Sequence, residues 1–380
     1  MACSLCSVRE RPRAEREPND DAVFHLLAAT PAMADLLAGV LAEHHVVCER
    51  RGTLFALLST GPARGKANAR VVELLRQVFS EPERRAVSVF CGNGEGFPAP
   101  RLLDEWWRVF ETAWFEKALT EDLFETWFQP IVDTSTHEVF AHECLIRLQR
   151  GRRFSGAEIV DAAIARNEVH RFDAYARSLA LRSAARQTAL AKPRDSVYFV
   201  NFMPSAIYNP DLCLQSTLQT LHECGMRPGN FVFEVVESEL VSDTVHLRRI
   251  CDYYRNHGFG FALDDVGTGA TSLQLVRDLA PDFVKLDKTL VQNVERPLCA
   301  ATIRKVVEIC DRADVTVIAP GVERAETLEN LWLLGVECMQ GYLLGHPRPN
   351  IVSPGNDLLH LAMALEEDHA VMKARLVAVH

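Results

Sequence analysis

The 380-residue sequence contains no long apolar run. No run approaches the ~18–20 residues that a bilayer-spanning helix needs. The first residues, MACSLCSVRERPRAEREPND, also lack the apolar core of a secretory signal. The apolar fraction of 48% and the charged fraction of 24% are those of an ordinary globular protein. We therefore expect a cytoplasmic protein without a membrane segment.

The chain also lacks an excess of basic residues. Lysine and arginine number 41, against 51 aspartates and glutamates, for a formal net charge of −10. Long nucleic acids are bound mainly through basic surface. We therefore do not expect a nucleic-acid polymer as a partner, although a small phosphate ligand held through a metal ion is compatible with this charge.

Paired cysteine motifs are scarce as well. The eleven cysteines are an odd number and lie mostly in apolar segments, which indicates reduced intracellular thiols and no disulfide framework. Cys3 and Cys6 form a C-x-x-C pair, but no second pair completes a four-ligand zinc site. We do not expect zinc to bind there.

Composition and periodicity divide the chain into four parts. Residues 1–20 are polar and rich in Arg, Glu and Pro, which predicts a disordered tail. Residues 21–100 read as strand, helix, two strands, helix and strand, which is the order of a small ferredoxin-like α+β domain. The amphipathic stretch 101–127 predicts a connecting helix, and residues 128–380 form the last part.

The last part alternates strand-like and helix-like segments. The predicted strands are eight apolar runs: 128–133, 139–148, 196–202, 231–237, 260–266, 282–288, 315–322 and 335–344. Eight strands with helices between most of them, over about 250 residues, predict a (β/α)₈ TIM-like barrel. Only TSTHE joins the first two runs, which is too short for a parallel crossover. The first strand is therefore predicted to be antiparallel.

Polar side chains gather at the ends of these strands, where a TIM-like barrel places its chemistry. They are Glu143, Arg147, Asn201, Glu234, Glu237, Asp264, Asp265, Lys285, Asp287, Glu323 and Gln340. So many carboxylates at one mouth repel one another unless cations bind, and oxygen ligands favour Mg²⁺ or Mn²⁺ over zinc. A lysine and an arginine beside such a metal suit a phosphate substrate. Each residue alone has a structural explanation such as helix capping, but their coincidence at successive strand ends favours a site.

Eight short motifs resemble, in order and spacing, the EAL domains. These are cyclic-di-GMP phosphodiesterases with a (β/α)₈-like barrel whose first strand is antiparallel. The motifs are FQPIVD, ECLIR, VNF, FEVVES, DDVGTGATSL, VKLDK, GVE and QGYLLGHP, within residues 110–350. The resemblance implies in-line hydrolysis of one phosphodiester bond to give linear pGpG, a two-metal site holding Mg²⁺ or Mn²⁺, and a homodimer.

The resemblance also implies a role for each matching residue. The implied metal ligands are Glu143, Asn201, Glu234 and Asp264 for the first ion and Asp265, supported by Asp287, for the second. The implied contacts to the dinucleotide are Gln129 and Arg147, while Gln340 would help to position the metal-bound water. Lys285 would hold the attacking water, and Glu237 would anchor the loop that begins at Asp265.

The sequence departs from the family pattern at the proposed general base. The seventh strand of the family usually ends A-E-G-V-E, but here the residues are A-P-G-V-E, so that Pro320 takes the place of the first acid. Proline cannot accept a proton, which leaves Glu323 as the retained second acid. Val266 and Ala270 also replace the Phe and Tyr of the loop that couples metal binding to dimerisation in the family. We expect hydrolysis to be weakened.

The N-terminal part carries a weaker likeness. RGTLFALL, residues 51–58, resembles the GGDEF stretch of diguanylate cyclases, and Gly52 and Phe55 match. Thr53 and Leu54 replace the two acids that would bind metal and substrate. A degenerate GGDEF-like domain and an unrelated ββ hairpin explain the stretch equally well, and neither predicts cyclase activity.

Three functions stay open at this point. The first is a weakened cyclic-di-GMP phosphodiesterase, which the retained metal ligands and Lys285 favour. The second is a catalytically inactive domain that senses cyclic-di-GMP or grips a regulatory protein partner, which Pro320 favours. The third is a regulator with a vestigial pocket, which the retention of Gln129 and Arg147 disfavours.

Overall fold

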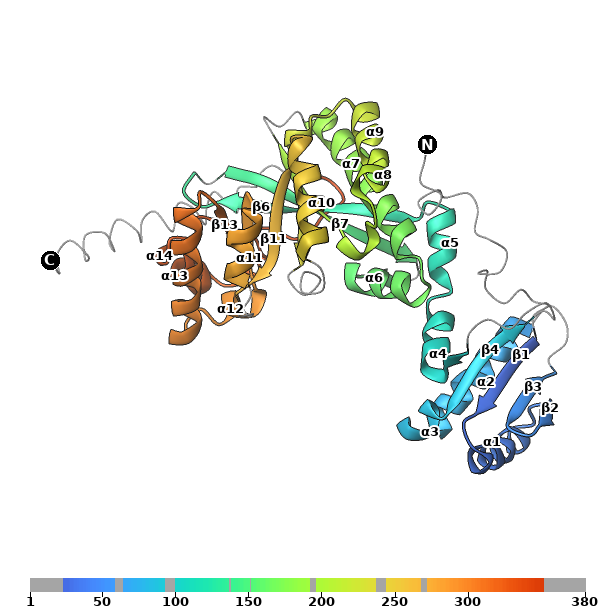
Figure 1. Cartoon of the computed structure of the whole chain (residues 1–380). Coiled ribbons are helices and arrows are strands. Elements are labelled where there is room, and N and C mark those ends of the chain that lie inside the picture. Colours follow the sequence, from blue (N-terminus) through green and yellow to red (C-terminus); the bar gives the residue numbers. More distant parts are fainter. Residues whose placement is uncertain are drawn as a thin grey trace. The chain divides into compact units, whose positions relative to one another are not determined.

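A computed structural model describes most of the chain in two compact units (Figure 1). The described residues are 23–58, 64–92, 100–136, 138–150, 152–191, 196–236, 244–267 and 272–351. The predicted tail with Cys3 and Cys6, the predicted loop anchor Glu237, and Ala270 lie outside these residues, as does the end of the chain from 352. None of the described helices combines the length and the apolar character that a bilayer crossing requires.

The smaller unit comprises 23–122 and 157–168 of the described residues, around a five-stranded antiparallel sheet in the order β2-β3-β1-β4-β5. Its strands are β1 (Val23–Ala28), β2 (Cys48–Arg51), β3 (Leu54–Leu57), β4 (Val87–Gly92) and β5 (Arg101–Leu102). β1 pairs antiparallel with both β3 and β4, which is the arrangement of a ferredoxin-like fold. The small α+β fold predicted for this part is confirmed, whereas the GGDEF-like alternative stays a prediction.

Helices also belong to this unit. They are α1 (Pro31–Glu43), α2 (Arg64–Val78), α3 (Glu81–Arg85), α4 (Leu103–Glu111), α5 (Trp114–Thr120) and most of α6 (Gly156–Ala165). Of these, α1, α2 and α4 contribute to its core. The Thr30 hydroxyl caps α1 by accepting from the amide of Met33, and Pro31 occupies the first turn. Trp106 of α4 packs edge-on against Phe24, with ring centroids 5.0 Å apart. Because Trp106 also donates to the Val89 carbonyl at 2.7 Å, α4 belongs to this core.

The single connecting helix predicted for residues 101–127 is wrong. β5, α4 and α5 occupy residues 101–120, and residues 124–127 are the start of a strand. The chain leaves the helical conformation at Asp122, whose φ of +54° lies in the left-handed region. Phe124 to Trp127 then pair antiparallel with Leu148 to Leu145. A short apolar run fits a helix or a strand equally well from its sequence, so this pairing decides the outcome.

The larger unit comprises 123–156 and 169–351 and contains the predicted barrel. The barrel strands are β6 (Phe124–Asp133), β7 (Glu138–Arg150), β9 (Val197–Asn201), β10 (Phe231–Val236), β11 (Gly260–Val266), β12 (Phe283–Leu286), β13 (Thr316–Ala319) and β14 (Cys338–Met339). β6 pairs antiparallel with both β7 and β14, which closes the ring, and the other neighbours in the ring are parallel. The predicted antiparallel first strand is confirmed. β8 (Arg152–Phe154) extends β7 outside the ring.

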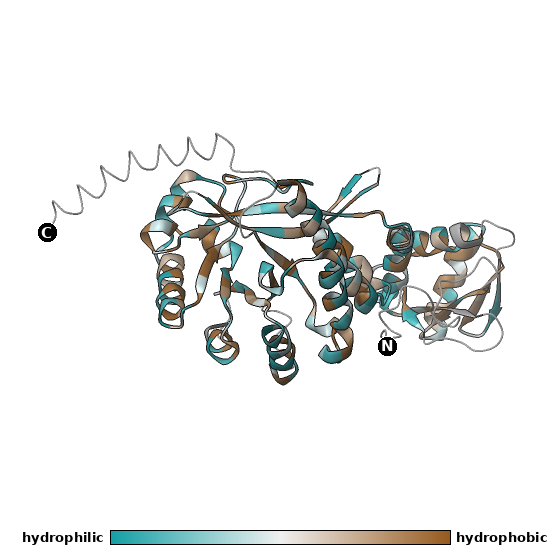
Figure 2. Cartoon of the chain, turned by 90° about the horizontal axis from the view of Figure 1, so that it is seen from above, coloured by the Kyte–Doolittle hydropathy of each residue, from teal (hydrophilic) through white to brown (hydrophobic). Residues whose placement is uncertain are grey.

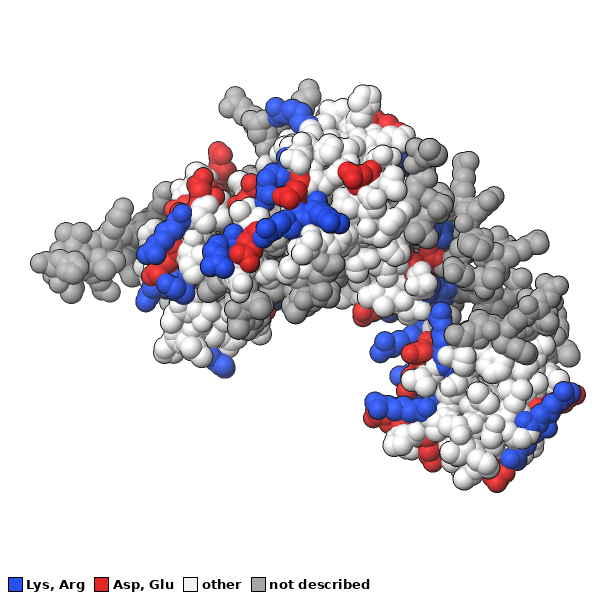
Figure 3. All heavy atoms as spheres, in the orientation of Figure 1, with Lys and Arg blue, Asp and Glu red and all other residues white. Residues whose placement is uncertain are grey.

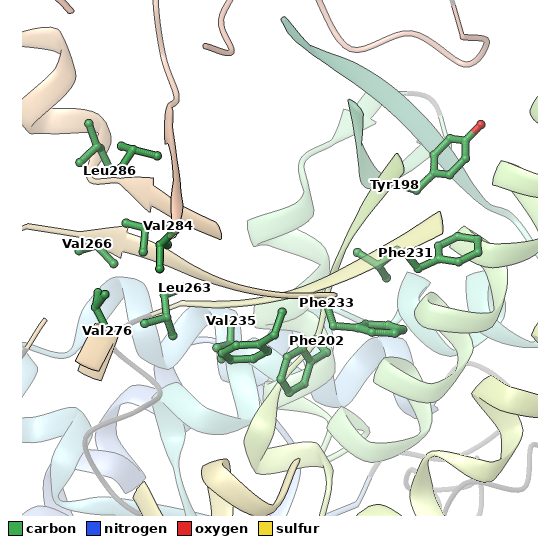
Figure 4. Packing of buried hydrophobic residues seen from close by; sticks show 14 of the residues in the cluster. Tyr198, Phe202, Phe231, Phe233, Val235, Leu263, Val266, Val276, Val284 and Leu286 are labelled. Atoms are coloured by element: carbon green, nitrogen blue, oxygen red, sulfur yellow. The ribbon is translucent and has the colours of Figure 1, made fainter. Parts of the chain in front are cut away.

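Helices lie around the strands of the larger unit (Figure 1). They are α7 (Val169–Ala191), η2 (Pro204–Ala206), α8 (Pro210–Cys213), α9 (Gln215–Cys224), η3 (Pro228–Asn230), α10 (Thr244–Asn256), α11 (Ser272–Leu279), α12 (Lys288–Gln292), α13 (Pro297–Arg312) and α14 (Ala325–Leu333). Hydrophobic residues gather along the strands and along one side of many helices (Figure 2). Phe202, Phe233 and Val235 lie in the layer between barrel and helices, where burial of apolar surface stabilises the fold (Figure 4).

Charged side chains are mixed on the surface. On the face shown in Figure 3, lysines and arginines lie next to aspartates and glutamates, and neither sign forms a broad patch there. This face therefore lacks the continuous basic surface that a long polyanion needs.

Candidate active site

Alternate residues of each strand point into the barrel, which arranges the inward side chains in layers. One apolar layer consists of Ile131, Ala141, Phe199, Val232, Ala262, Ile318 and Cys338, with the partly buried Phe283. The next inward positions toward the C-terminal mouth lie two residues further along each parallel strand, and two residues earlier on the antiparallel β6. They are Gln129, Glu143, Asn201, Glu234, Asp264, Lys285, Pro320 and Gln340. Seven of these eight positions are polar, and the eighth is Pro320.

A buried lysine lies at the centre of this polar layer. The Nζ atom of Lys285 is 3.1 Å from Glu234 Oε2, 3.2 Å from Glu143 Oε2 and 4.0 Å from Asp264 Oδ2. Lys285 is 2% exposed and Glu234 is fully buried. Three carboxylates thus face a single ammonium group in a region with little water, where their negative charge is incompletely balanced.

The pKa values of the cluster follow from this balance. Burial lowers the pKa of Lys285, but Asp264, Glu143 and Glu234 together raise it well above the ordinary value. Burial is also the main reason why the pKa of Glu234 lies well above the ordinary value, despite the nearby lysine. Burial opposes ionisation of Glu143 too, but Lys285 and hydrogen bonds from neighbouring side chains outweigh it and bring its pKa to about 2. Burial thus opposes ionisation of Glu234, whereas the neighbours of Glu143 favour its charged form.

Two amide side chains orient Glu143. Gln340 Nε2 donates to Glu143 Oε2 at 2.6 Å, and Asn201 Nδ2 donates to Glu143 Oε1 at 3.1 Å. Since Asn201 uses its nitrogen in this bond, its amide oxygen is the atom that remains for a cation. The three residues come from β7, β9 and the end of β14, so closure of the barrel brings them together.

The two predicted substrate contacts lie on the antiparallel pair β6 and β7. Gln129 is buried and donates from Nε2 to the Gly345 carbonyl at 3.2 Å. Arg147 is half-buried and donates from Nη1 to its neighbour's carbonyl, Ile146 O, at 2.8 Å. Burial lowers the pKa of Arg147, and Glu143 opposes this by favouring its charged form.

Asp265 and Asp287, predicted at the second metal, differ in how they are held. Asp265 has φ of +58°, and its amide donates to Asp264 Oδ1 at 2.8 Å. Asp287 caps α12, because its Oδ1 accepts from the amide of Leu290 at 3.0 Å. Its charge also contributes to raising the pKa of Asp264, although burial of Asp264 is the larger cause. Asp287 therefore combines a helix-capping role with a position near the carboxylate cluster.

The donor set fits a hard divalent cation. Glu234 Oε1 is a buried carboxylate oxygen that has no hydrogen-bond partner among the described residues. Such an orphaned atom is costly unless a ligand satisfies it. Glu143, Asn201, Glu234 and Asp264 offer only oxygen ligands, as Mg²⁺ and Mn²⁺ prefer. In the described structure, Lys285 lies among the carboxylates, and no three histidine, cysteine, aspartate or glutamate side chains have metal-binding spacing.

Comparison with known families identifies this barrel. A family model described as "EAL domain" matches residues 112–347. The chain is a member of the EAL domain family. The match begins before β6 and ends after β14, so it covers every strand that contributes to the polar layer.

Solved structures and curated relatives agree with this assignment. A standalone EAL protein from Vibrio cholerae, solved in its c-di-GMP-bound form, is 30% identical, with a TM-score of 0.56 over 62% of this chain and 97% of that chain. The cyclic di-GMP phosphodiesterase RocR from Pseudomonas aeruginosa is 32% identical over 130 residues, which are 34% of this chain and 33% of that protein. Three other relatives, from Caulobacter vibrioides, Synechocystis and Shewanella oneidensis, are matched over 27%, 33% and 14% of their own lengths.

Structural likeness also extends beyond the EAL domain. BlrP1 from Klebsiella pneumoniae, solved as a manganese and cyclic-di-GMP complex, covers 86% of this chain and 96% of that chain, with a TM-score of 0.54. Residues 112–347 make up a smaller share of the chain than this, so the match reaches into the smaller unit. At 21% identity, the likeness concerns the fold alone.

The seventh strand of the EAL domain ends at the position that the sequence singled out. Ala319 O accepts from the Gln340 amide at 2.8 Å, and Gln340 O accepts from the Val322 amide at 3.0 Å. These two bonds hold Pro320 beside Gln340 at the mouth of the barrel. Glu323 is not one of the eight inward positions. Its side chain is 42% exposed, and its Oε1 is 3.3 Å from both Lys288 Nζ and Gln292 Nε2.

Sequence reasoning missed the partner of Glu323. Lys288 is an exposed lysine in the first turn of α12. Exposed lysines are common on protein surfaces, so the sequence alone does not mark this one as functional. Its contact with Glu323 depends on how α12 lies beside the loop after β13. Val266, which replaces a Phe of the family pattern, is 1% exposed and belongs to the core between barrel and helices.

Proposed function

We propose that this protein is cytoplasmic and that its EAL domain binds cyclic-di-GMP with two divalent cations, Mg²⁺ or Mn²⁺. We further propose that it hydrolyses the dinucleotide to pGpG at a rate that Pro320 lowers. The observation that carries this proposal is the inward layer at the barrel mouth, in which seven positions keep polar groups and the eighth is proline. The cyclic-di-GMP complex of the Vibrio cholerae relative and the named phosphodiesterase from Pseudomonas aeruginosa support the choice of ligand and reaction.

The proposed metal ligands belong to two groups. The first ion is assigned to Glu143, Asn201, Glu234 and Asp264, and the second to Asp265 with support from Asp287. Bound divalent cations would supply water activation at neutral pH and neutralisation of charge on the phosphoryl oxygens. The manganese complex of the Klebsiella pneumoniae protein supports the use of such ions on this fold.

The side chains of the domain perform the remaining tasks. Lys285 holds the attacking water and offsets the charge that builds up on the phosphate, and the three carboxylates keep it protonated for this role. Arg147 and Gln129 bind the dinucleotide, Arg147 through its guanidinium, which matches phosphate geometry. Gln340 positions the water, and its bond to Glu143 fixes its amide.

Proton removal from the water is the weakened step. Pro320 has no group that accepts a proton, and general-base assistance is typically worth about 10²–10⁴-fold in rate. Glu323 is the remaining acid that we propose for this task, and it has to leave Lys288 and Gln292 to perform it. If Glu323→Gln lowers residual pGpG production without changing cyclic-di-GMP binding, this role is supported. Unchanged production removes Glu323 from the catalytic residues.

The second candidate is a catalytically inactive cyclic-di-GMP sensor, or a domain that contacts a regulatory protein. Pro320 and the ion pair of Glu323 with Lys288 favour it. Incubation with cyclic-di-GMP and Mn²⁺ separates the candidates, with pGpG followed by chromatography and binding by calorimetry. Slow pGpG production supports the weakened enzyme, whereas binding with no product supports the sensor. We also propose a homodimer, which light scattering with and without the dinucleotide tests.

A further inference from the structure

Helix α7 carries a buried ion pair that lies outside the polar layer. Arg177 Nε donates to Asp173 Oδ2 at 2.8 Å, and the two side chains are 1% and 2% exposed. Arg177 also donates to the hydroxyl of Thr217 on α9. Burying two charges is costly unless their hydrogen-bonding capacity is well used. The hydrogen bond that the second oxygen of Asp173 accepts therefore matters for the role of this ion pair.

The second oxygen of Asp173 holds the chain just after a proposed metal ligand. Asp173 Oδ1 accepts from the amide of Met203 at 2.9 Å, and this bond is buried. Met203 follows Asn201 by two residues. Asp173 thus connects helix α7 to the segment that follows strand β9, without itself being part of the polar layer.

Further contacts fix the same segment on both sides. The amide of Phe202 donates to the Glu234 carbonyl at 3.1 Å. The Phe202 ring packs against Tyr254 with centroids 5.4 Å apart, in the core that Figure 4 shows. His170, also on α7, donates from Nδ1 to the Ala206 carbonyl at 2.6 Å. Helix α7 therefore holds residues 202–206 at two points, through Asp173 and His170.

We propose that Asp173, supported by Arg177, is a positioning residue for Asn201. By holding the Met203 amide, Asp173 keeps the backbone of the segment in the place where Asn201 Nδ2 reaches Glu143, so that the amide oxygen of Asn201 would be available to hold the cation. This inference rests on the proposed function, because it assigns Asn201 to the first metal ion. Replacing a residue that holds a metal ligand in place typically weakens metal binding by about 10–100-fold.

The test compares Mn²⁺ binding in two variants of the full chain. Asp173→Asn keeps the shape of the side chain, but its single oxygen can accept from the Met203 amide or from Arg177, not from both. Tyr198→Phe is the matched control, because it removes a hydrogen bond of 2.8 Å between β9 and Thr188 of the same helix, away from Asn201. Calorimetry and electron paramagnetic resonance measure Mn²⁺ affinity with and without cyclic-di-GMP, and circular dichroism melting shows that each variant is folded.

We expect Asp173→Asn to bind Mn²⁺ about tenfold more weakly than the wild type, and Tyr198→Phe to bind within about twofold of it. Should Asp173→Asn fail to fold, His170→Leu removes the second point of attachment and is expected to weaken Mn²⁺ binding in the same direction. Mn²⁺ affinity that is unchanged in the folded variants while the wild type binds the ion would overturn this inference alone. A folded wild type that binds no Mn²⁺ would overturn the proposed function and this inference together.

Discussion

Lys285 Nζ lies 3.1 Å from Glu234 Oε2, and both side chains are buried at the centre of the barrel mouth. The other oxygen of Glu234 has no hydrogen-bond partner in the described part of the chain. One lysine cannot satisfy this carboxylate together with Glu143 and Asp264. This imbalance is the local cost that we expect of the proposed metal site, since functional sites commonly carry such costs.

Replacing Glu234 by glutamine is expected to separate folding from metal binding. The amide removes a carboxylate whose ionisation is opposed by burial, so the metal-free variant should melt at or above the wild-type temperature. Mn²⁺ at a concentration of 100 times its Kd should stabilise the wild type by about 2.7 kcal/mol and so raise its melting temperature. This rise should be lost in Glu234→Gln. Thermal melts with and without Mn²⁺ measure both effects. Glu308→Gln, at an exposed ion pair with Lys305, is the control, and an unchanged Mn²⁺ response in Glu234→Gln would contradict the ligand assignment.

Gly341, after β14, lies very close to the backbone of Val322, after β13. A Cβ atom at this position would lie 1.9 Å from Val322 O and 2.3 Å from Val322 N, and neither backbone atom is free to move aside. Gly341→Ala should therefore destabilise the domain by about 3 kcal/mol or more and abolish cyclic-di-GMP binding. Gly229→Ala is the control, since its added Cβ meets only an ordinary contact of 3.9 Å. Urea denaturation and calorimetry measure the effects, and near-wild-type behaviour of Gly341→Ala would show that this approach is not needed.

The burial of the His142 ring predicts that the stability of the domain depends on pH. Both of its ring nitrogens are buried without a hydrogen-bond partner among the described residues, and burial lowers its pKa from 6.5 to about 4. Since the unfolded chain binds the proton more tightly, stability is lost as the pH falls from 6.5 toward 4. Between pH 7 and pH 5, this loss amounts to about 2 kcal/mol.

His142→Phe should remove that part of the acid sensitivity. The phenyl ring keeps the packing against Tyr198, whose ring centroid is 6.2 Å away, and loses no hydrogen bond. We expect equal unfolding free energies at pH 7 and a variant that is more stable by about 2 kcal/mol at pH 5. Denaturant titrations of both chains at each pH isolate the contribution of His142 from that of the carboxylates. Parallel pH profiles would show that His142 is not responsible.

Much of the site could be predicted from the sequence because strand alternation is a local property. Once Glu143, Glu234 and Lys285 are placed at strand ends, closure of a barrel brings them together. The antiparallel first strand also followed from a linker that is too short for a crossover. The ends of the strands were less predictable: the run 335–344 yields only Cys338–Met339 as strand.

What could not be predicted depends on contacts between distant segments. Residues 124–127 continue the apolar pattern of the helices before them, and only pairing with β7 makes them a strand. The bond from Met203 to Asp173 spans 30 residues, and nothing in the sequence near Asn201 points to it. The ion pair of Glu323 with Lys288 likewise arises from the arrangement of α12 beside the loop after β13.

The proposed defect at the end of β13 can be tested by placing an acid there. Pro320→Glu supplies a carboxylate at the eighth inward position, and Pro320→Gln supplies a side chain of the same shape that cannot act as a base. The most direct measurement is the rate of pGpG formation from cyclic-di-GMP and Mn²⁺ by the wild type and both variants, with binding confirmed by calorimetry. We expect Pro320→Glu to exceed both the wild type and Pro320→Gln by about 10²-fold or more, at similar affinity. Equal rates in the three metal-loaded, ligand-binding proteins would contradict the claim that Pro320 is what limits hydrolysis.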